Sequence, residues 1–274
     1  MKFGVVTNEL KDPDLKITGQ IKQLLNTRGI SCKVSKSAAD FQTDTDVMMV
    51  LGGDGTMLQA ARESAGKNIP LIGINLGTLG FLSEVEKENI EEAVDKLLRK
   101  EYEKEERMML CGKITGNGRS TTISPALNDI SITRTGSLQI INLRIFVNGK
   151  VLCNLNADGI IISTPTGSTG YNMSAGGPIV EPGADLILVT PICAHTLNAR
   201  SIVLRPEDIV EVQVMEGRLG RNQTVEANSD GYEGIPMQTG DKIQIRKAKE
   251  TTTILKLSKM CFLEILHKKM GDAK

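Results

Sequence analysis

Residues 46–56 read DVMMVLGGDGT, an uninterrupted apolar run that ends in a turn of glycines. A continuous apolar run is typical of a parallel strand that is covered on both faces of its sheet. The residues that follow, Met57–Ser64, have the pattern of a helix. Strand, glycine turn and helix in this order predict one unit of an α/β fold with a parallel sheet.

The two parts of the chain differ in the secondary structure that their sequences predict. Before residue 101, strands are expected at Lys2–Thr7, Ile30–Val34 and Ile69–Leu76, and helices at Ile17–Arg28 and Ile90–Leu98. After the charged boundary Glu101–Arg107, short strands are expected at Ile130–Thr133, Leu143–Val147, Val151–Leu155, Ile160–Ser163, Leu186–Thr190, Ile209–Val214, Lys242–Arg246 and Thr252–Leu257. Asn148-Gly149 predicts a type I′ hairpin turn, and Met260–Met270 a terminal helix that packs on the first domain. The fold class is therefore a parallel, Rossmann-like α/β N-terminal domain followed by a β-rich C-terminal domain.

Composition excludes several classes of function. Lys plus Arg number 33 and Asp plus Glu 33, so a nucleic-acid partner bound by overall basicity is not expected. Stretches of ~20 apolar residues are absent from the sequence, so no membrane association is expected. The five cysteines form no C-x-x-C pair and lie among apolar residues, which predicts small core residues and a cytoplasmic location.

The glycine turn combines two opposite signals. Gly52 and Gly53 leave the backbone N–H groups open to phosphate oxygens, and the helix that follows adds a favourable dipole. Asp54 repels phosphate, which indicates proton or hydroxyl chemistry beside a phosphate. A strand-end turn with a helix-capping Asp54 is the alternative. The segment is neither a P-loop nor a dinucleotide fingerprint, because it lacks Gly-Lys-Ser/Thr and has Leu58 where the fingerprint needs glycine.

Two further segments offer polar groups. Thr164–Tyr171 (TPTGSTGY) follows an apolar strand and presents hydroxyls and open backbone, suited to a sugar-phosphate or a purine edge, with Tyr171 able to stack on a ring. A hydroxyl-rich loop that caps a helix is the alternative. Asn128 and Asp129 can bind vicinal ribose hydroxyls, although the pair is also common in turns.

GGDGT, then Asn75–Phe81 (NLGTLGF), then Asn128-Asp129, then Asp158–Gly177 (DGIIISTPTGSTGYNMSAGG), in this order, closely resemble the bacterial NAD kinases over nearly the whole chain. The resemblance implies an α/β domain of residues 1–106 plus 258–274 and a β-rich domain of residues 107–257. It implies transfer of the γ-phosphoryl group of ATP to the 2′-hydroxyl of the adenosine ribose of NAD. Some members also accept inorganic polyphosphate. The family further implies a homodimer or homotetramer. Because the glycine turn contains no lysine to neutralise phosphate, Mg²⁺ carried by ATP is expected to do much of this.

The resemblance also implies roles for single residues. Asp54 would accept the proton of the hydroxyl and Gly55 would lie against NAD, while Phe81 would pack near the adenine. The phosphate donor would be held by Gly52, Gly53 and Thr56. The remaining NAD-binding positions are Asn128, Asp129, Asn156, Asp158, Thr166, Thr169, Gly170, Tyr171, Asn172 and Ser174. The sequence departs from the family at three positions, where other members often carry a basic residue instead of Asn156, alanine instead of Gly170 and glutamine instead of Tyr232. His195 is expected to have a structural role.

Two other functions share parts of this pattern. Diacylglycerol-type lipid kinases carry GGDGT, but they usually continue into a Pro-Leu-Gly-Thr-Gly-Asn-type segment, whereas Ile72–Gly80 reads IGINLGTLG. A non-catalytic NAD(H) or NADP(H) sensor would keep the dinucleotide loops and lose the base, and Asp54 is present. The sequence identifies no metal ligands.

Overall fold

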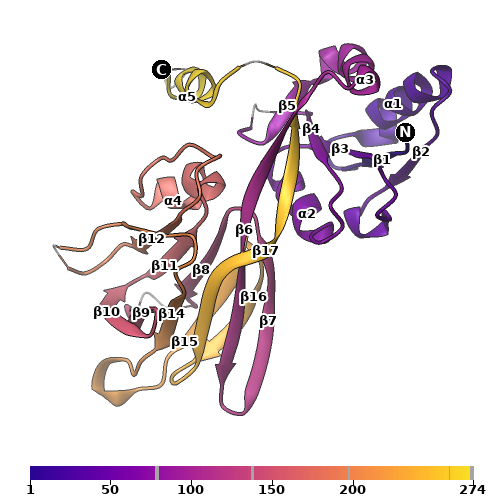
Figure 1. The fold of residues 1–274 in the computed structure, drawn as a ribbon. Coiled ribbons are helices and arrows are strands. Elements are labelled where there is room, and N and C mark those ends of the chain that lie inside the picture. The colour runs from indigo at the N-terminus through magenta and orange to yellow at the C-terminus, as the bar shows by residue number, and fades with distance from the viewer. Residues whose placement is uncertain (78–79, 137–138, 197, 259, 272–274) are drawn as a thin grey trace. The chain divides into compact units, whose positions relative to one another are not determined.

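The computed structural model describes residues 1–77, 80–136, 139–196, 198–258 and 260–271. The chain forms two compact units, Met1–Arg107 with Thr251–Lys274 and Met108–Glu250. It passes into the second unit within β6 (Glu103–Gly116) and returns within β17 (Lys242–Lys256), both visible in Figure 1.

The first unit is an α/β domain built on a parallel sheet, which confirms the predicted class. Its strands are β1 (Phe3–Val6), β2 (Cys32–Ser35), β3 (Val47–Gly52), β4 (Leu71–Asn75) and β5 (Ser83–Glu86). Its helices are α1 (Lys16–Thr27), α2 (Asp54–Glu63), α3 (Ile90–Arg99) and α5 (Phe262–Gly271). The sheet runs β17-β4-β3-β1-β2, with β5 also on β4, and every one of these pairs is parallel.

Local sequence explains the elements nearest the glycine turn. All six residues of β3 are buried, as an uninterrupted apolar run requires. Helix α2 begins at Asp54, three residues before the predicted start, because the end of the glycine turn is itself the first helical turn. In α3 the buried residues recur at helical spacing, with acidic residues in the first turn and basic ones in the last.

The second unit consists of antiparallel strands in two sheets. One contains β9 (Ile141–Val147), β10 (Lys150–Ala157), β14 (Val210–Val214) and β17, together with the β6–β7 hairpin, β7 being Arg119–Ala126. The other contains β8 (Asp129–Arg134), β11 (Gly159–Ser163), β12 (Ile187–Ile192), β13 (Ile202–Leu204), β15 (Thr224–Ser229) and β16 (Tyr232–Gln238). Side chains from both sheets, among them Ile145, Ile162 and Val212, share one hydrophobic core.

One expectation about the second unit is confirmed and two need correction. The hairpin turn at Asn148-Gly149 is confirmed, since both residues have positive φ, 51° and 76°. The two strands expected near residues 242 and 252 are one strand, β17, that continues through polar residues. The β6–β7 hairpin was not predicted, because its first residues are charged and resemble a linker.

The cysteines are not the core residues that the sequence suggested. Cys153, Cys193 and Cys261 are exposed, Cys32 and Cys111 are half-buried, and all five are free. An apolar neighbourhood in sequence does not bury a thiol that projects from the outer side of a strand or from a loop. The cytoplasmic location stays a prediction. Among the described residues, no helix has both the length and the apolar character needed to span a membrane.

Candidate active site

The Asp54 carboxylate is held in place at the start of α2. The backbone N–H of Phe81 donates to its Oδ2 over 2.8 Å, and that of Leu82 to its Oδ1 over 3.0 Å. Both donors belong to the segment after β4, so the two sequence motifs GGDGT and NLGTLGF meet at this carboxylate. A Cβ at Gly80 would lie 1.8 Å from Oδ1, which explains the glycine there.

The turn before Asp54 requires glycine for steric reasons. A Cβ on Gly52 would lie 2.2 Å from Oγ1 of Thr56. That hydroxyl accepts a hydrogen bond from the side-chain amide of Asn8 over 3.1 Å, which ties the loop after β1 to the turn. Gly55 has open space around it. The structure therefore gathers Gly52, Gly53, Asp54, Gly55, Thr56 and Phe81 of the predicted site in the first unit.

The terminal helix α5 brings a cation to the same place. Lys269 is half-buried, with Nζ 4.1 Å from the centre of the Phe81 ring. Burial lowers the pKa of Lys269, and the nearby charge of Asp54 opposes that shift. The sequence-based site missed Lys269, because nothing in the pattern distinguishes it from the neighbouring Lys268.

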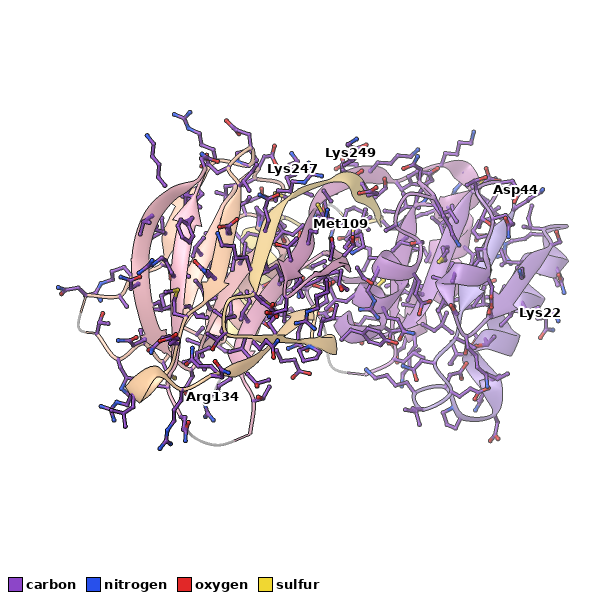
Figure 2. All side chains as sticks on the ribbon, turned by 90° about the horizontal axis from the view of Figure 1, so that it is seen from below. Lys22, Asp44, Met109, Arg134, Lys247 and Lys249 are labelled. Carbon is purple, nitrogen blue, oxygen red and sulfur yellow. The ribbon has the colours of Figure 1, made fainter. Side chains whose placement is uncertain are left out.

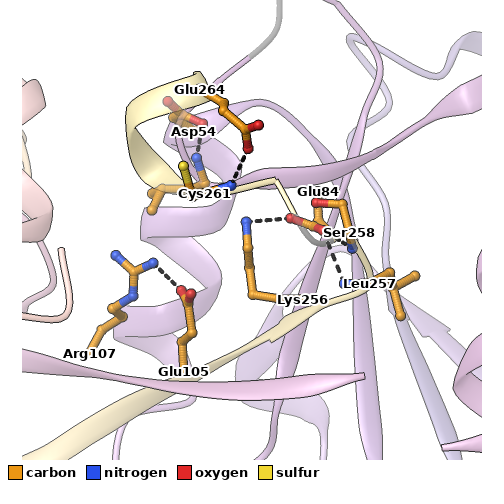
Figure 3. Close-up of polar contacts among 10 residues, drawn as sticks. Asp54, Glu84, Glu105, Arg107, Lys256, Leu257, Ser258, Cys261 and Glu264 are labelled. Carbon is orange, nitrogen blue, oxygen red and sulfur yellow. Dashed lines mark hydrogen bonds and ion pairs between the residues drawn. The ribbon is translucent and has the colours of Figure 1, made fainter. Parts of the chain in front are cut away.

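A buried ion pair anchors the chain just before α5. Nζ of Lys256 lies 2.5 Å from Oε2 of Glu84, and the two side chains are only 13% and 3% exposed. The other oxygen of Glu84 accepts the backbone N–H groups of Leu257 and Ser258 over 3.0 and 2.7 Å. Figure 3 shows this cluster. Glu84 lies two residues after Leu82, so the anchor and the Asp54 clamp share one short segment.

In the second unit, Asp230 organises the predicted Asn128-Asp129 pair. Its carboxylate accepts the backbone N–H groups of Leu127, Asn128 and Asp129 over 2.9, 2.8 and 3.1 Å. Three amides on one carboxylate fix the turn that precedes β8. The sequence-based site missed this role of Asp230, because its distance along the chain hides the contact.

Asn128 carries a buried oxygen that the fold does not satisfy, and Asp129 carries a buried carboxyl. Oδ1 of Asn128 is buried and accepts no hydrogen bond from the described part of the chain. Asp129 is only 5% exposed, and its burial, with a smaller effect from Asp230, raises the pKa of its carboxyl to about 7. A buried acceptor without a partner is costly, so a ligand donor at this point would relieve it.

The TPTGSTGY loop packs directly on this turn. The backbone N–H of Thr164 donates to the carbonyl oxygen of Asn128 over 2.8 Å. The Thr164 hydroxyl donates to the carbonyl oxygen of Leu127 over 2.6 Å. A Cβ on Gly167 would lie 2.2 Å from the Asn128 carbonyl oxygen, so only glycine allows this approach. At Gly170 the added Cβ would lie 3.1 Å from Nδ2 of Asn128, a tight contact.

Tyr171, the last residue of the TPTGSTGY loop, is partly accessible, and Asp158 belongs to an ion pair. Burial raises the pKa of the Tyr171 hydroxyl, and Cys193, Asp129 and Asp158 add to the rise in that order. Tyr171 nevertheless remains 44% exposed, so one part of its ring is accessible. Asp158 is paired with Arg134, whose Nε lies 3.0 Å from Oδ1. Asp158, one of the predicted NAD-binding positions, is therefore a member of an ion pair.

The other predicted positions differ in accessibility. Asn172 is fully buried. Its side-chain amide donates hydrogen bonds to the carbonyls of Ser168 and Pro178 and accepts one from the hydroxyl of Thr190. Thr166 is also buried, Thr169 is half-buried, and Ser174 is exposed.

Asn156 is exposed on β10 and lies in a polar pocket. Its carbonyl accepts the backbone N–H of His195 over 2.8 Å. Asn156, His195 and Arg134 line a pocket of about 880 Å³ in the second unit. The described residues contain no group of three or more His, Cys, Asp or Glu side chains that could hold a metal ion.

Comparisons with known proteins bear on both units. Residues 26–102 match the ATP-NAD kinase N-terminal domain, and residues 127–257 match the ATP-NAD kinase C-terminal domain. An NAD kinase of Lachnoclostridium phytofermentans is 42% identical over 282 aligned positions, covering 99% of each chain. An NAD kinase of Agathobacter rectalis is 43% identical over 281 positions, covering 98% of each.

Solved structures resemble the chain as well. Yeast NADH kinase complexed with NADH superposes with a TM-score of 0.86 at 23% identity, covering 100% of this chain and 88% of that one. An NAD kinase from Archaeoglobus fulgidus in complex with ATP gives a TM-score of 0.77 at 25% identity, covering 94% and 95%.

Proposed function

The chain belongs to the ATP-NAD kinase family, and from this membership we propose that it is an NAD kinase. It transfers the γ-phosphoryl group of ATP to the 2′-hydroxyl of the adenosine ribose of NAD and so forms NADP. Similarity over the full length to proteins named NAD kinase supports the activity. The clamped carboxylate of Asp54 at a phosphate-type glycine turn is the observation in this chain that carries the proposal.

Asp54 acts as the general base in this proposal. As the 2′-oxygen bonds to the γ-phosphorus, a carboxylate oxygen takes the hydroxyl proton, and the bond to the β,γ-bridging oxygen breaks to release ADP. The amides of Phe81 and Leu82 keep the carboxylate in position. Base assistance is typically worth ~10²–10⁴-fold, and the rest of the catalysis comes from alignment and charge stabilisation.

We propose that Mg²⁺ enters with the phosphates of ATP, where it neutralises charge on the donor. The described residues form no cluster suited to holding a resident ion. In the proposal, the residues of the chain therefore bind and orient the donor around this ion. Inorganic polyphosphate would offer the same phosphate chain without the nucleoside.

The second-unit residues would hold the dinucleotide. The buried, unpartnered Oδ1 of Asn128 supports a contact with a ribose or amide donor. The accessible part of the Tyr171 ring supports a ring contact. Asn172 would act by shaping the loop, because its side chain is fully engaged inside the protein.

One assay tests the activity. The protein is incubated with ATP, Mg²⁺ and NAD, and NADP is measured with an NADP-specific dehydrogenase. Parallel reactions replace NAD by NADH or by diacylglycerol, and ATP by polyphosphate. We expect NADP from NAD and ATP. Phosphorylation of diacylglycerol without NADP would indicate a lipid kinase, and binding of NAD without turnover would indicate a sensor.

Replacing Asp158 or Tyr171 by Ala is expected to raise KM for NAD and leave KM for ATP within a few-fold. The loss should be larger for Asp158→Ala, since a charge-assisted hydrogen bond is worth about 1.5–3 kcal/mol. The ring contact of Tyr171 is worth about 0.5–1.5 kcal/mol beyond its buried area. Steady-state kinetics with each substrate varied in turn measure both constants.

Asp185→Ala is the control for Asp158→Ala, because Asp185 also pairs with a basic residue, Lys247, is exposed, and is not among the predicted NAD-binding positions. Its KM values should equal those of the wild type. If either test substitution raised KM for ATP and left KM for NAD unchanged, the dinucleotide would not bind at this loop.

We also propose a homo-oligomer, a dimer or a tetramer. Strands β10 and β13 lie at sheet edges, and each exposes a valine, Val151 at 58% and Val203 at 55%. Exposed apolar strand edges need cover, and a second copy would supply it. Sedimentation velocity at assay concentration should show no monomer in the active preparation. A fully active monomer would overturn the proposal.

A further inference from the structure

The glycine turn has a lysine ammonium beside it that the sequence does not suggest. Nζ of Lys11 lies so close to Gly53 that a Cβ on this glycine would be 2.9 Å from it. Lys11 comes from the loop after β1, forty-two positions before Gly53 along the chain. The absence of a side chain at Gly53 is what leaves room for the ammonium.

Two neighbouring residues fix the loop that carries Lys11. Asn8 donates from its side-chain amide to Thr56, and its carbonyl accepts the backbone N–H groups of Lys11 and Asp12 over 3.0 and 2.8 Å. Asp12 is 2% exposed and accepts three hydrogen bonds from Ile17 and Thr18 at the start of α1. Lys11 therefore lies between two anchored residues, while its own side chain is exposed.

The charge of Lys11 is not used by the fold. Within the described ranges its ammonium has no carboxylate or hydrogen-bond partner. Beside it is a turn shaped for phosphate, and Asp54, the residue after this turn, carries a negative charge that repels phosphate. A polyphosphate bound here needs a cation close to the backbone amides, and an ammonium is a common phosphate-binding group.

We infer that Lys11 binds the phosphate chain of the phosphoryl donor at the Gly52-Gly53 turn. The inference rests on the proposed kinase function and adds a donor-specific residue from outside the glycine motif. Gly53 then has a second purpose, because any side chain there would displace the ammonium.

The test compares Lys11→Ala, Lys11→Met and Lys11→Arg with Lys22→Ala. Lys22 is an exposed lysine of α1 and extends away from the ribbon, as Figure 2 shows. Lys11→Ala and Lys11→Met should raise KM for ATP about 10- to 100-fold and leave KM for NAD within about two-fold. Lys11→Arg should recover most of the ATP affinity, and Lys22→Ala should match the wild type. Thermal melting curves show whether each variant folds, and Lys11→Met keeps the aliphatic stem.

A binding measurement separates this inference from the proposed function. Isothermal titration with inorganic tripolyphosphate and with adenosine, both without NAD, requires no turnover. Tripolyphosphate should bind Lys11→Ala about 10-fold or more weakly than the wild type, while adenosine should bind both alike. An active wild type with unchanged KM for ATP in Lys11→Ala would overturn the inference, as would a loss confined to NAD. A wild type that makes no NADP would overturn the function alone, and the tripolyphosphate titration would still decide the role of Lys11.

Discussion

Asp54→Asn is expected to fold and to bind both substrates, and to lose about 10²–10⁴-fold in kcat. An amide has nearly the same size as the carboxylate but cannot take a proton from the ribose hydroxyl. The structure adds a second cost, because both carboxylate oxygens accept backbone N–H groups and an amide has only one oxygen. A loss of about 1–3 kcal/mol in the free energy of unfolding should accompany the loss of turnover.

The kinetic and thermodynamic parts of this prediction can be measured separately. Single-turnover rates with saturating ATP and NAD give the chemical step, and urea unfolding gives the stability. Glu63→Gln is the matched control, since Glu63 lies at the other end of α2 and accepts hydrogen bonds from Ser37 and Ala38. The control should lose stability and keep kcat. If Asp54→Asn kept a near-normal kcat, Asp54 would not be the base.

Gly80→Ala is expected to lose at least about 10²-fold in kcat while the protein still folds. The new methyl carbon would lie 1.8 Å from Oδ1 and 2.6 Å from Cγ of Asp54, so the carboxylate must move. Movement breaks its bonds to the amides of Phe81 and Leu82 and takes the base out of reach of the acceptor hydroxyl. A displacement of about 1 Å is enough for a loss of this size.

Gly19→Ala is the control for this substitution. Gly19 lies within α1, and a Cβ there would meet no atom within 4 Å. Alanine at such a helical position should leave kcat unchanged and stabilise the protein by about 0.4–1 kcal/mol. A crystal structure of Gly80→Ala should show a rotated Asp54 side chain. Full activity of Gly80→Ala would mean that the observed position of the carboxylate is not the catalytic one.

Contacts that are local in the sequence could be predicted from it. The apolar run of β3, the glycines after it and the acidic residue that opens α2 lie within one strand–turn–helix unit. Their pattern alone therefore predicted the strand–turn–helix unit that carries Asp54. The same holds for the Asn148-Gly149 hairpin, which two adjacent residues specify.

Contacts between distant segments could not be predicted in this way. The amides that hold Asp54 belong to Phe81 and Leu82, and any residue type offers a backbone amide. Lys11 and Lys269 are ordinary surface-type lysines until the fold brings one beside Gly53 and the other over Phe81. Pattern and propensity describe neighbours along the chain, whereas these groups meet only through tertiary structure.

The position of β17 has a consequence for how the protein is made. Ile254 of β17 pairs with Leu71 of β4, so an interior part of the first unit comes from the end of the chain. A ribosome releases the N-terminus first, and domains generally fold as units in that order. Here β1 to β5 emerge early, and β5 already pairs with Gly73–Asn75 of β4, but the Leu71 end of β4 lacks its β17 partner until the second unit has been synthesised. Such long-range pairing slows folding, because its loop-closure entropy is lost before the contact forms. The synthesis of β17 thus sets when the parallel sheet of the first unit becomes complete.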